Sequence, residues 1–283
     1  QGVTAAKLIP LLVLVAVGLF FIKPHNLAWP GLPGGSQMAR TSIMLIFAFM
    51  GTEAAINVSG EVRDPSRTVP RSILLAMLSV TILYMAIQIV AQGVLGPELA
   101  VSTKAPLAAT AKRILGSGGE LLVLVGASVS MLGYIAGDVL AAPRGLYALG
   151  HDRLLPAALG AVHPKFRTPH VAIATYTALC MLFAVTSSFE GLLVLSVLCA
   201  LIVYFICSLA AMELQRRDVR MEGAEPMRLP GGPLIPVISV AIVVWLMTSS
   251  TRQEYTAMGI MLAVITLYYF IMRPRRVAVP TPS

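Results

Sequence analysis

The chain is dominated by apolar runs, each roughly long enough to cross a lipid bilayer. A membrane helix needs about 20 mostly apolar residues to span roughly 30 Å of hydrocarbon. Eight runs approach this length: residues 1–22, 41–60, 72–95, 120–142, 171–187, 191–212, 233–249 and 254–272. We expect the fourth run to continue as a helix to about Gly150. The sequence therefore predicts an all-α polytopic membrane protein.

The overall composition agrees with this interpretation. Of the 283 residues, 57% are hydrophobic and only 12% are charged, whereas an ordinary soluble domain has about 25% charged residues. This leaves too little polar surface for a soluble enzyme, a disordered chain or a nucleic-acid-binding protein. Cys180, Cys199 and Cys207 lie inside apolar runs, and the four histidines have no ligand-like spacing. We therefore expect no metal site and no cofactor.

The basic residues are distributed unevenly between the loops. Most of the Lys and Arg residues follow the second, fourth, sixth and eighth runs, for example Arg63, Arg144, Arg216 and Arg273. By the positive-inside rule, these loops and the C-terminus are predicted to be cytoplasmic. The formal net charge of +8 is then mostly a topological signal. The sequence predicts a multi-pass protein of the cell (cytoplasmic) membrane.

The second apolar run has a polar interruption. It is apolar up to Gly51 and then continues into Thr52 and Glu53. A carboxylate at bilayer depth costs about 2.5–3.5 kcal/mol on the mildest insertion scales, and glycine eases departure from helical geometry. Transporters use such broken helices to present backbone groups to a substrate. The pattern favours a functional break, and the alternative is a plain helix with a flexible glycine and an interfacial glutamate.

Lys7 is a charged residue inside the first run. If the helix began after Lys7, residues 8–22 would cover only about 22 Å at 1.5 Å per residue. The helix should therefore begin upstream, which places Lys7 within the membrane. The alternative is a lysine that snorkels to the cytoplasmic interface.

Five motifs stand out along the chain: FAFMGTE at 47–53, GEVRDPSRTVPR at 60–71, RGLYALGHDRLLP at 144–156, HPKFRTP at 163–169 and MRLPGGP at 227–233. Together they resemble one family, the amino acid–polyamine–organocation (APC) superfamily of permeases. The resemblance covers nearly the whole chain. It implies a transporter fold with a five-plus-five inverted repeat, in which the eight runs are helices five to twelve of twelve.

On this resemblance the chain, residues 1–283, is a single partial transporter domain. Residues 1–22 would form the last helix of the first repeat, residues 41–212 the second repeat, and residues 233–272 two trailing helices. Residue 1 is Gln, and the apolar pattern is already present at Val3. We therefore expect an N-terminally truncated permease that lacks helices one to four.

The resemblance also implies a site for substrate binding and gating. Phe47 falls at the position of a gating aromatic residue, and Glu53 and Tyr204 fall at a carboxylate–phenol pair that could close the outer path by a hydrogen bond. Ser196 matches a substrate-contacting serine, although a hydrogen bond within its own helix is an equally good interpretation. The full predicted set is Phe47, Met50, Gly51, Thr52, Glu53, Tyr134, Asp138, Ser196 and Tyr204.

Three of the predicted site residues bear on substrate and coupling. Tyr134 and Asp138 are one turn apart and share a helix face. Asp138 replaces a substrate-stacking tryptophan of a family antiporter, so it could pair with a cationic group or mark the inner mouth of the path. Lys7 matches a lysine that takes the place of a sodium ion in a proton-coupled family member. An amine there could titrate when it is desolvated.

The implied function is secondary active transport of amino acids or related amines by alternating access. Proton coupling or exchange is favoured over sodium symport, and the expected partners are a small-molecule substrate, membrane lipid and protons, with no nucleic acid. A membrane enzyme is disfavoured because the sequence has no nucleophile–base pair, metal-ligand spacing or phosphate loop, so no catalytic residue is expected. The alternative is a non-transporting sensor or accessory relative, against which Gly51 and Glu53 argue.

Overall fold

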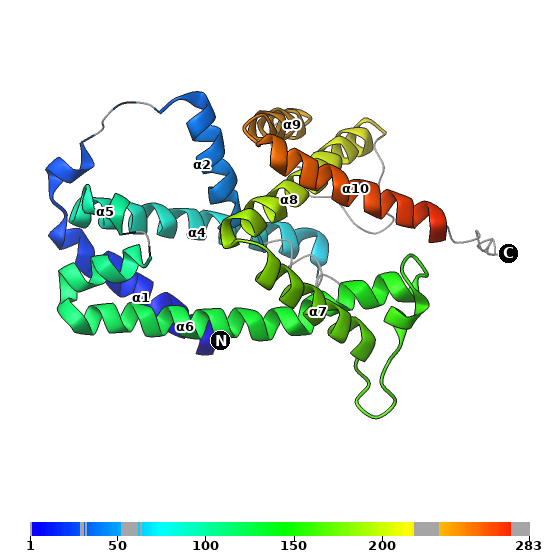
Figure 1. Cartoon of the computed structure of the whole chain (residues 1–283). Helices are drawn as coiled ribbons and strands as arrows, with labels where there is room; N and C mark the ends of the chain where they lie inside the picture. Colours follow the sequence, from blue (N-terminus) through cyan, green and yellow to red (C-terminus); the bar gives the residue numbers. More distant parts are fainter. Residues whose placement is uncertain are drawn as a thin grey trace. The chain divides into compact units, whose positions relative to one another are not determined.

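The apolar runs form helices, as expected for segments whose backbone groups must find hydrogen-bond partners without water. The computed structural model describes residues 2–28, 31, 33–51, 62, 64–102, 104–217 and 232–272, and regular structure in these residues is helical (Figure 1). The α-helices are α1 (Gly2–Gly18), α2 (Gly35–Phe47), α4 (Pro65–Leu95), α5 (Glu98–Val101), α6 (Pro106–His151), α7 (His170–Thr186), α8 (Phe189–Arg216), α9 (Leu234–Met247) and α10 (Arg252–Met272). Short 3₁₀ helices are η1 (Leu19–Phe21), η2 (Pro24–Leu27) and η4 (Ala157–Gly160). The all-α prediction is confirmed.

The lengths of the helices agree with membrane crossing. Among the described residues, four helices are long and apolar enough to span a membrane by length and composition: Pro65–Leu95, Pro106–His151, Phe189–Arg216 and Arg252–Ile271. Shorter apolar helices cover Ala6–Phe21, His170–Thr186 and Leu234–Met247. Together with α2, these helices correspond to the predicted runs.

Two helices differ from the predicted boundaries. Helix α6 continues to His151, close to the predicted end, but it begins at Pro106 rather than near residue 120. Its early part was missed because it carries charges, and Gly116 interrupts it with φ 69° and ψ −158°. Helix α2 begins at Gly35 and ends at Phe47. The remainder of the second run, residues 52–60, lies outside the described residues.

The chain divides into two units, of which the first comprises Gln1–Leu32 and Leu74–Ala141. Its core joins α1, the end of α4 and α6 through a cluster of buried residues: Leu14, Val90, Val94, Ala108, Ala111, Ile114 and Val123. Hydrogen bonds support the same junction, since the Lys23 N–H donates to the Gly93 carbonyl over 3.0 Å and the Asn26 amide donates to that carbonyl over 2.9 Å. Helix α1 is thereby fixed to the end of α4.

The second unit comprises Pro33–Ile73 and Ala142–Ser283, and α8 lies at its centre. Helices α2, α9 and α10 all contact α8. The buried cluster consists of Ala39, Ile43, Val194, Val197, Leu198, Leu201, Val243, Leu246 and Met258. The members of this cluster are all apolar, so this core holds α2 against α8 by close packing.

The segment after α6 returns to make a close backbone contact with the end of that helix. A Cβ atom added at Gly150 would lie 2.7 Å from the backbone nitrogen of Gly160 and 2.8 Å from Cβ of Leu159. Glycine at position 150 therefore allows η4 to pack directly against the end of α6. This gives a physical reason for one glycine of the RGLYALGHDRLLP motif.

We predict that Gly150→Ala lowers the stability of the protein, because the added methyl group meets backbone that has little freedom to move. Overpacking of this kind costs about 1–3 kcal/mol. The measurement is the thermal unfolding midpoint of the detergent-solubilised protein. Gly145→Ala on the same helix is the matched control, since nothing lies within 4 Å of its added Cβ. Equal midpoints for the two variants would contradict the contact.

Candidate functional site

Helix α2 ends at the position where the sequence predicts a break. The turn that follows is tightened by hydrogen bonds between residues three apart: the Ala48 N–H donates to the Leu45 carbonyl over 3.0 Å, and the Phe49 N–H donates to the Ile46 carbonyl over 2.9 Å. Gly51 then has φ 102°, a conformation that side-chain-bearing residues rarely adopt. The backbone therefore leaves helical geometry between Phe47 and Gly51. Thr52 and Glu53 lie outside the described residues.

An apolar stripe on α2 brings the break to α8. Ala39 and Ile43 are buried in the core of the second unit, and Ile46 and Met50 pack partly buried against it. The spacing of Ala39, Ile43 and Ile46 places them on one face of α2, and Met50 follows in the turn after the helix. Tyr204 of α8 packs against the same cluster. Two predicted site residues, Met50 and Tyr204, are thus brought to one core.

The remaining predicted residues near the break differ in exposure. Phe47 is the last residue of α2, and its side chain is 40% exposed. Ser196 of α8 donates its hydroxyl to the Leu193 carbonyl over 2.8 Å, which is a bond within its own helix. The Ser196 bond is the one that the alternative interpretation describes, and the substrate-contacting roles of Phe47 and Ser196 stay predictions.

Tyr204 also lines a cavity of about 370 Å³ between α8 and α9. Ser208 and Ser239 line it as well, and their hydroxyl oxygens are 3.1 Å apart. The Ser208 hydroxyl lies 2.7 Å from the Tyr204 carbonyl and can donate to it. This cavity joins one predicted gating residue to a polar contact between two helices, which sequence spacing alone could not locate.

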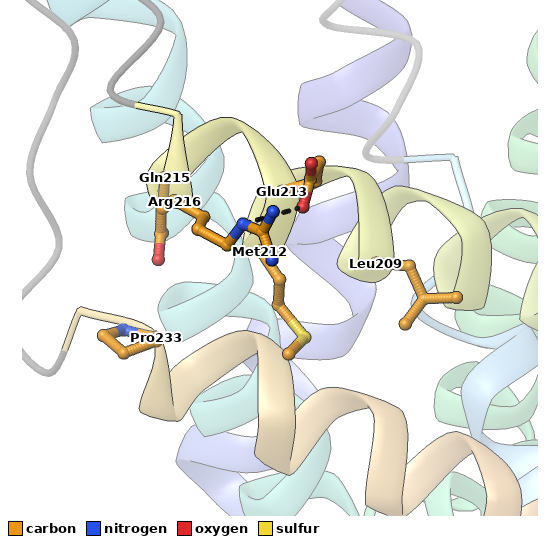
Figure 2. Close-up of a pocket in the computed structure, with 6 residues that line it drawn as sticks. All are labelled: Leu209, Met212, Glu213, Gln215, Arg216 and Pro233. Carbon is orange, nitrogen blue, oxygen red and sulfur yellow. Dashed lines mark ion pairs between the residues drawn. The ribbon is translucent and has the colours of Figure 1, made fainter.

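A second cavity, of about 610 Å³, lies at the end of α8 (Figure 2). Figure 2 shows Glu213 and Arg216 of α8 joined by an ion pair, with Pro233 at the start of α9 nearby. The Arg216 Nε atom is 3.5 Å from one Glu213 carboxylate oxygen, and Arg217 Nε is 2.6 Å from the other. Gln215 lines both cavities. Sequence reasoning used these arginines only for topology, although the neighbouring Glu213 was a signal for a charged rim.

In the first unit, Lys7 lines a cavity of about 740 Å³ between α1, α4 and α6. Tyr84 and Ser130 are among the polar residues of its lining, which is otherwise mostly apolar. Lys7 is exposed, and a second lysine, Lys104, lines the same cavity. The coupling role of Lys7 stays a prediction.

Tyr134 and Asp138 are also in the first unit. They lie one turn apart on α6, and Tyr134 is 73% exposed. The described predicted residues are divided between the two units: Lys7, Tyr134 and Asp138 belong to the first, and Phe47, Met50, Gly51, Ser196 and Tyr204 belong to the second. Among the described residues, no group of His, Cys, Asp and Glu could hold a metal ion.

Comparison with known proteins identifies the family. A family model described as amino acid permease matches residues 1–272. The chain belongs to the amino acid permease family. The resemblance to the APC superfamily is thereby confirmed, and the helical architecture of this permease agrees with it. The inverted repeat stays a prediction.

Several characterised bacterial transporters are similar to this permease. A methylthioribose transporter of Bacillus subtilis is 26% identical over 272 residues, covering 94% of this chain and 57% of that protein. A branched-chain amino acid permease of the same organism is 25% identical, with the same coverage of both chains. A serine/threonine exchanger, also from Bacillus subtilis, is 28% identical and is covered over 62% of its length. The chain thus spans roughly three-fifths of the length of these relatives.

We predict that Gly51→Ala strains the break. The positive φ at Gly51 disfavours any side chain, at a cost of order 1–3 kcal/mol, even though the space around its Cβ position is open. The thermal unfolding midpoint in detergent should fall. Gly35→Ala at the start of α2 is the control, because its Cβ also meets open space and its φ is not positive. A midpoint lowered equally in both variants would show that the backbone conformation is not the cause.

Proposed function

We propose that this protein takes part in secondary active transport of amino acids or related amines across the cytoplasmic membrane by alternating access. The observation that carries the proposal is the end of α2 at Phe47, followed by Gly51 with positive φ, in a chain that matches the amino acid permease family over residues 1–272. Backbone groups near a helix break can bind a charged or polar substrate inside a membrane. The break also disfavours the non-transporting alternative.

The substrate end of the site would be built around the break. Phe47 is exposed enough to fold over a bound substrate, and Met50 and Tyr204 pack on the core that supports it. Glu53 would close the outer path with Tyr204. Ser196 would contact substrate after rotation of its hydroxyl away from the Leu193 carbonyl. Thr52 would contribute backbone at the break.

The class of substrate is supported by the names of the relatives. Two of them act on neutral amino acids, namely the branched-chain amino acid permease and the serine/threonine exchanger, and the methylthioribose transporter carries an uncharged molecule. We propose a small zwitterionic amino acid as the first candidate. Asp138 and Tyr134 on α6 would act at the inner part of the path, where the carboxylate favours a substrate amine.

Coupling would involve Lys7. Lys7 lines the 740 Å³ cavity, and its amine would be the group through which transport is coupled to protons. Proton symport or exchange follows from this arrangement more naturally than sodium symport, because an ammonium group supplies the positive charge locally. The loops after the even-numbered runs and the C-terminus would face the cytoplasm.

Uptake assays test the transport proposal. The full-length protein is reconstituted in proteoliposomes and given radiolabelled L-serine, L-leucine, L-arginine or L-glutamate, with and without an imposed pH gradient. We expect saturable uptake of at least one of these amino acids. If none is transported or competes, the transport proposal fails.

We predict that Lys7→Met abolishes the dependence of uptake on the pH gradient, because the side chain can no longer bind a proton. Exchange of substrate at equal pH on both sides should persist. Lys23→Met is the matched control: Lys23 is an exposed lysine beyond the other end of α1, outside the Lys7 cavity. Unchanged gradient-driven uptake in Lys7→Met would exclude Lys7 from coupling.

A further inference from the structure

Three helices of the second unit begin at the same place, and one arginine joins them. Arg40 lies in the second turn of α2, and its Nη1 atom donates to the Oε1 atom of Glu254 over 2.6 Å. Its Nη2 atom is 3.9 Å from the Oε1 atom of Glu190. Glu254 lies in the first turn of α10 and Glu190 in the first turn of α8. The starts of α2, α8 and α10 are therefore linked through a single guanidinium group.

The Arg40–Glu254 ion pair is less exposed to water than an ordinary surface ion pair. The Glu254 side chain is 18% exposed and that of Arg40 is 31% exposed, whereas Glu190 is 66% exposed. Water and salt screen a half-buried pair less than an exposed one. Glu254 is the stronger partner, and Glu190 adds a weaker contact to α8.

Glu254 is itself held in place by the start of α10. Its second carboxylate oxygen accepts the Thr251 N–H over 2.7 Å, and the Thr251 hydroxyl lies 3.4 Å from the Glu254 N–H. This reciprocal arrangement is a capping box, which orders the first turn of a helix. The carboxylate that receives Arg40 is thus oriented before the ion pair forms.

Helix α2 connects Arg40 to Phe47 without interruption. Ala39 and Ile43, which flank Arg40 in the sequence, are almost completely buried against α8. Phe47 lies seven positions after Arg40, a rise of about 10 Å along a helix. A shift or rotation at Arg40 would therefore be transmitted to Phe47 and to the turn that ends at Gly51.

We propose that Arg40 is a positioning residue for the substrate site. Its ion pairs with Glu254 and Glu190 hold the start of α2 against α10 and α8, and so fix where the Phe47–Gly51 segment stands. The proposal rests on the transport function proposed above, since it assigns Arg40 to the same site. By the distribution of basic residues, this end of the helices is the non-cytoplasmic one, where substrate enters during uptake.

The first test compares the kinetics of uptake in variants that remove only the charge contact. Arg40→Gln and Glu254→Gln both break the ion pair, and Glu254→Gln keeps an oxygen that can accept the Thr251 N–H. We expect each to raise KM at least threefold with a smaller change in Vmax and in the unfolding midpoint. The double variant should be no worse than either single one, because the two residues act through one interaction. Arg40→Lys, which keeps the charge, should recover most of the affinity.

Arg113→Gln is the matched control for ion-pair loss. It breaks the exposed Arg113–Glu98 pair in the first unit, which contacts none of the predicted site residues, so KM should stay at the wild-type value. Additive effects of Arg40→Gln and Glu254→Gln, or equal effects of Arg113→Gln, would overturn the proposal.

The second test does not require transport. Phe47→Cys is introduced into a background that carries Cys180→Ala, Cys199→Ala and Cys207→Ala, and the reaction of the new thiol with a membrane-impermeant maleimide is measured in membranes. We expect Arg40→Gln and Glu254→Gln to change the labelling rate at least threefold, and Arg113→Gln to leave it unchanged. Equal labelling rates in all variants would overturn the positioning role. If the wild type transported none of the amino acids, the function proposal would fail, and this labelling result alone would decide the role of Arg40.

Discussion

The structure depends first on the need of every backbone N–H and C=O group for a partner in an environment without water. Helices meet this need along their length, whereas the backbone groups at a helix end inside the membrane must find other partners. Most helices here stop near the ends of apolar runs. Helix α2 stops within one, at Phe47, and Gly51 with φ 102° turns the chain there. The proposed transport site is built on this departure from helical geometry.

Helix α8 supports the short helix α2 by packing against it. It contacts α2, α9 and α10, and its residues Val194, Val197 and Leu198 are buried at the centre of the second unit. Helix α2 therefore does not rely on its own short length of 13 residues for stability. Packing along one face and an ion pair at its start hold α2 in place. Tyr204 belongs to the same helix, so support and candidate gating are provided by one element.

The helices were predictable because long apolar runs leave few structural alternatives. The end of α2 near Gly51 was predictable because this glycine stands directly before polar residues. The start of α6 was not predictable from apolarity. Lys112 and Glu120 form an ion pair of 2.9 Å across the kink at Gly116, and these charges hid the helix.

The candidate site was predictable mainly through family motifs. They indicated Met50 and Tyr204, which the structure places on one core, but Arg40 and Glu254 are 214 residues apart and no local pattern links them. The cavities beside Lys7 and Tyr204 likewise require several helices at once. Thr52 and Glu53 keep their predicted roles without a structural description.

The length of α6 has a mechanical consequence. From Gly116 to His151 the helix continues for about 50 Å at 1.5 Å per residue, well beyond the roughly 30 Å of hydrocarbon in a bilayer. An upright helix of this length extends about 20 Å beyond the hydrocarbon, and its final turns carry Pro143, Arg144 and His151. Pro143 removes one backbone hydrogen bond within the helix and so marks a position at which α6 can bend. The end of α6 beyond Pro143 is therefore not bound to follow the tilt of the part inside the membrane.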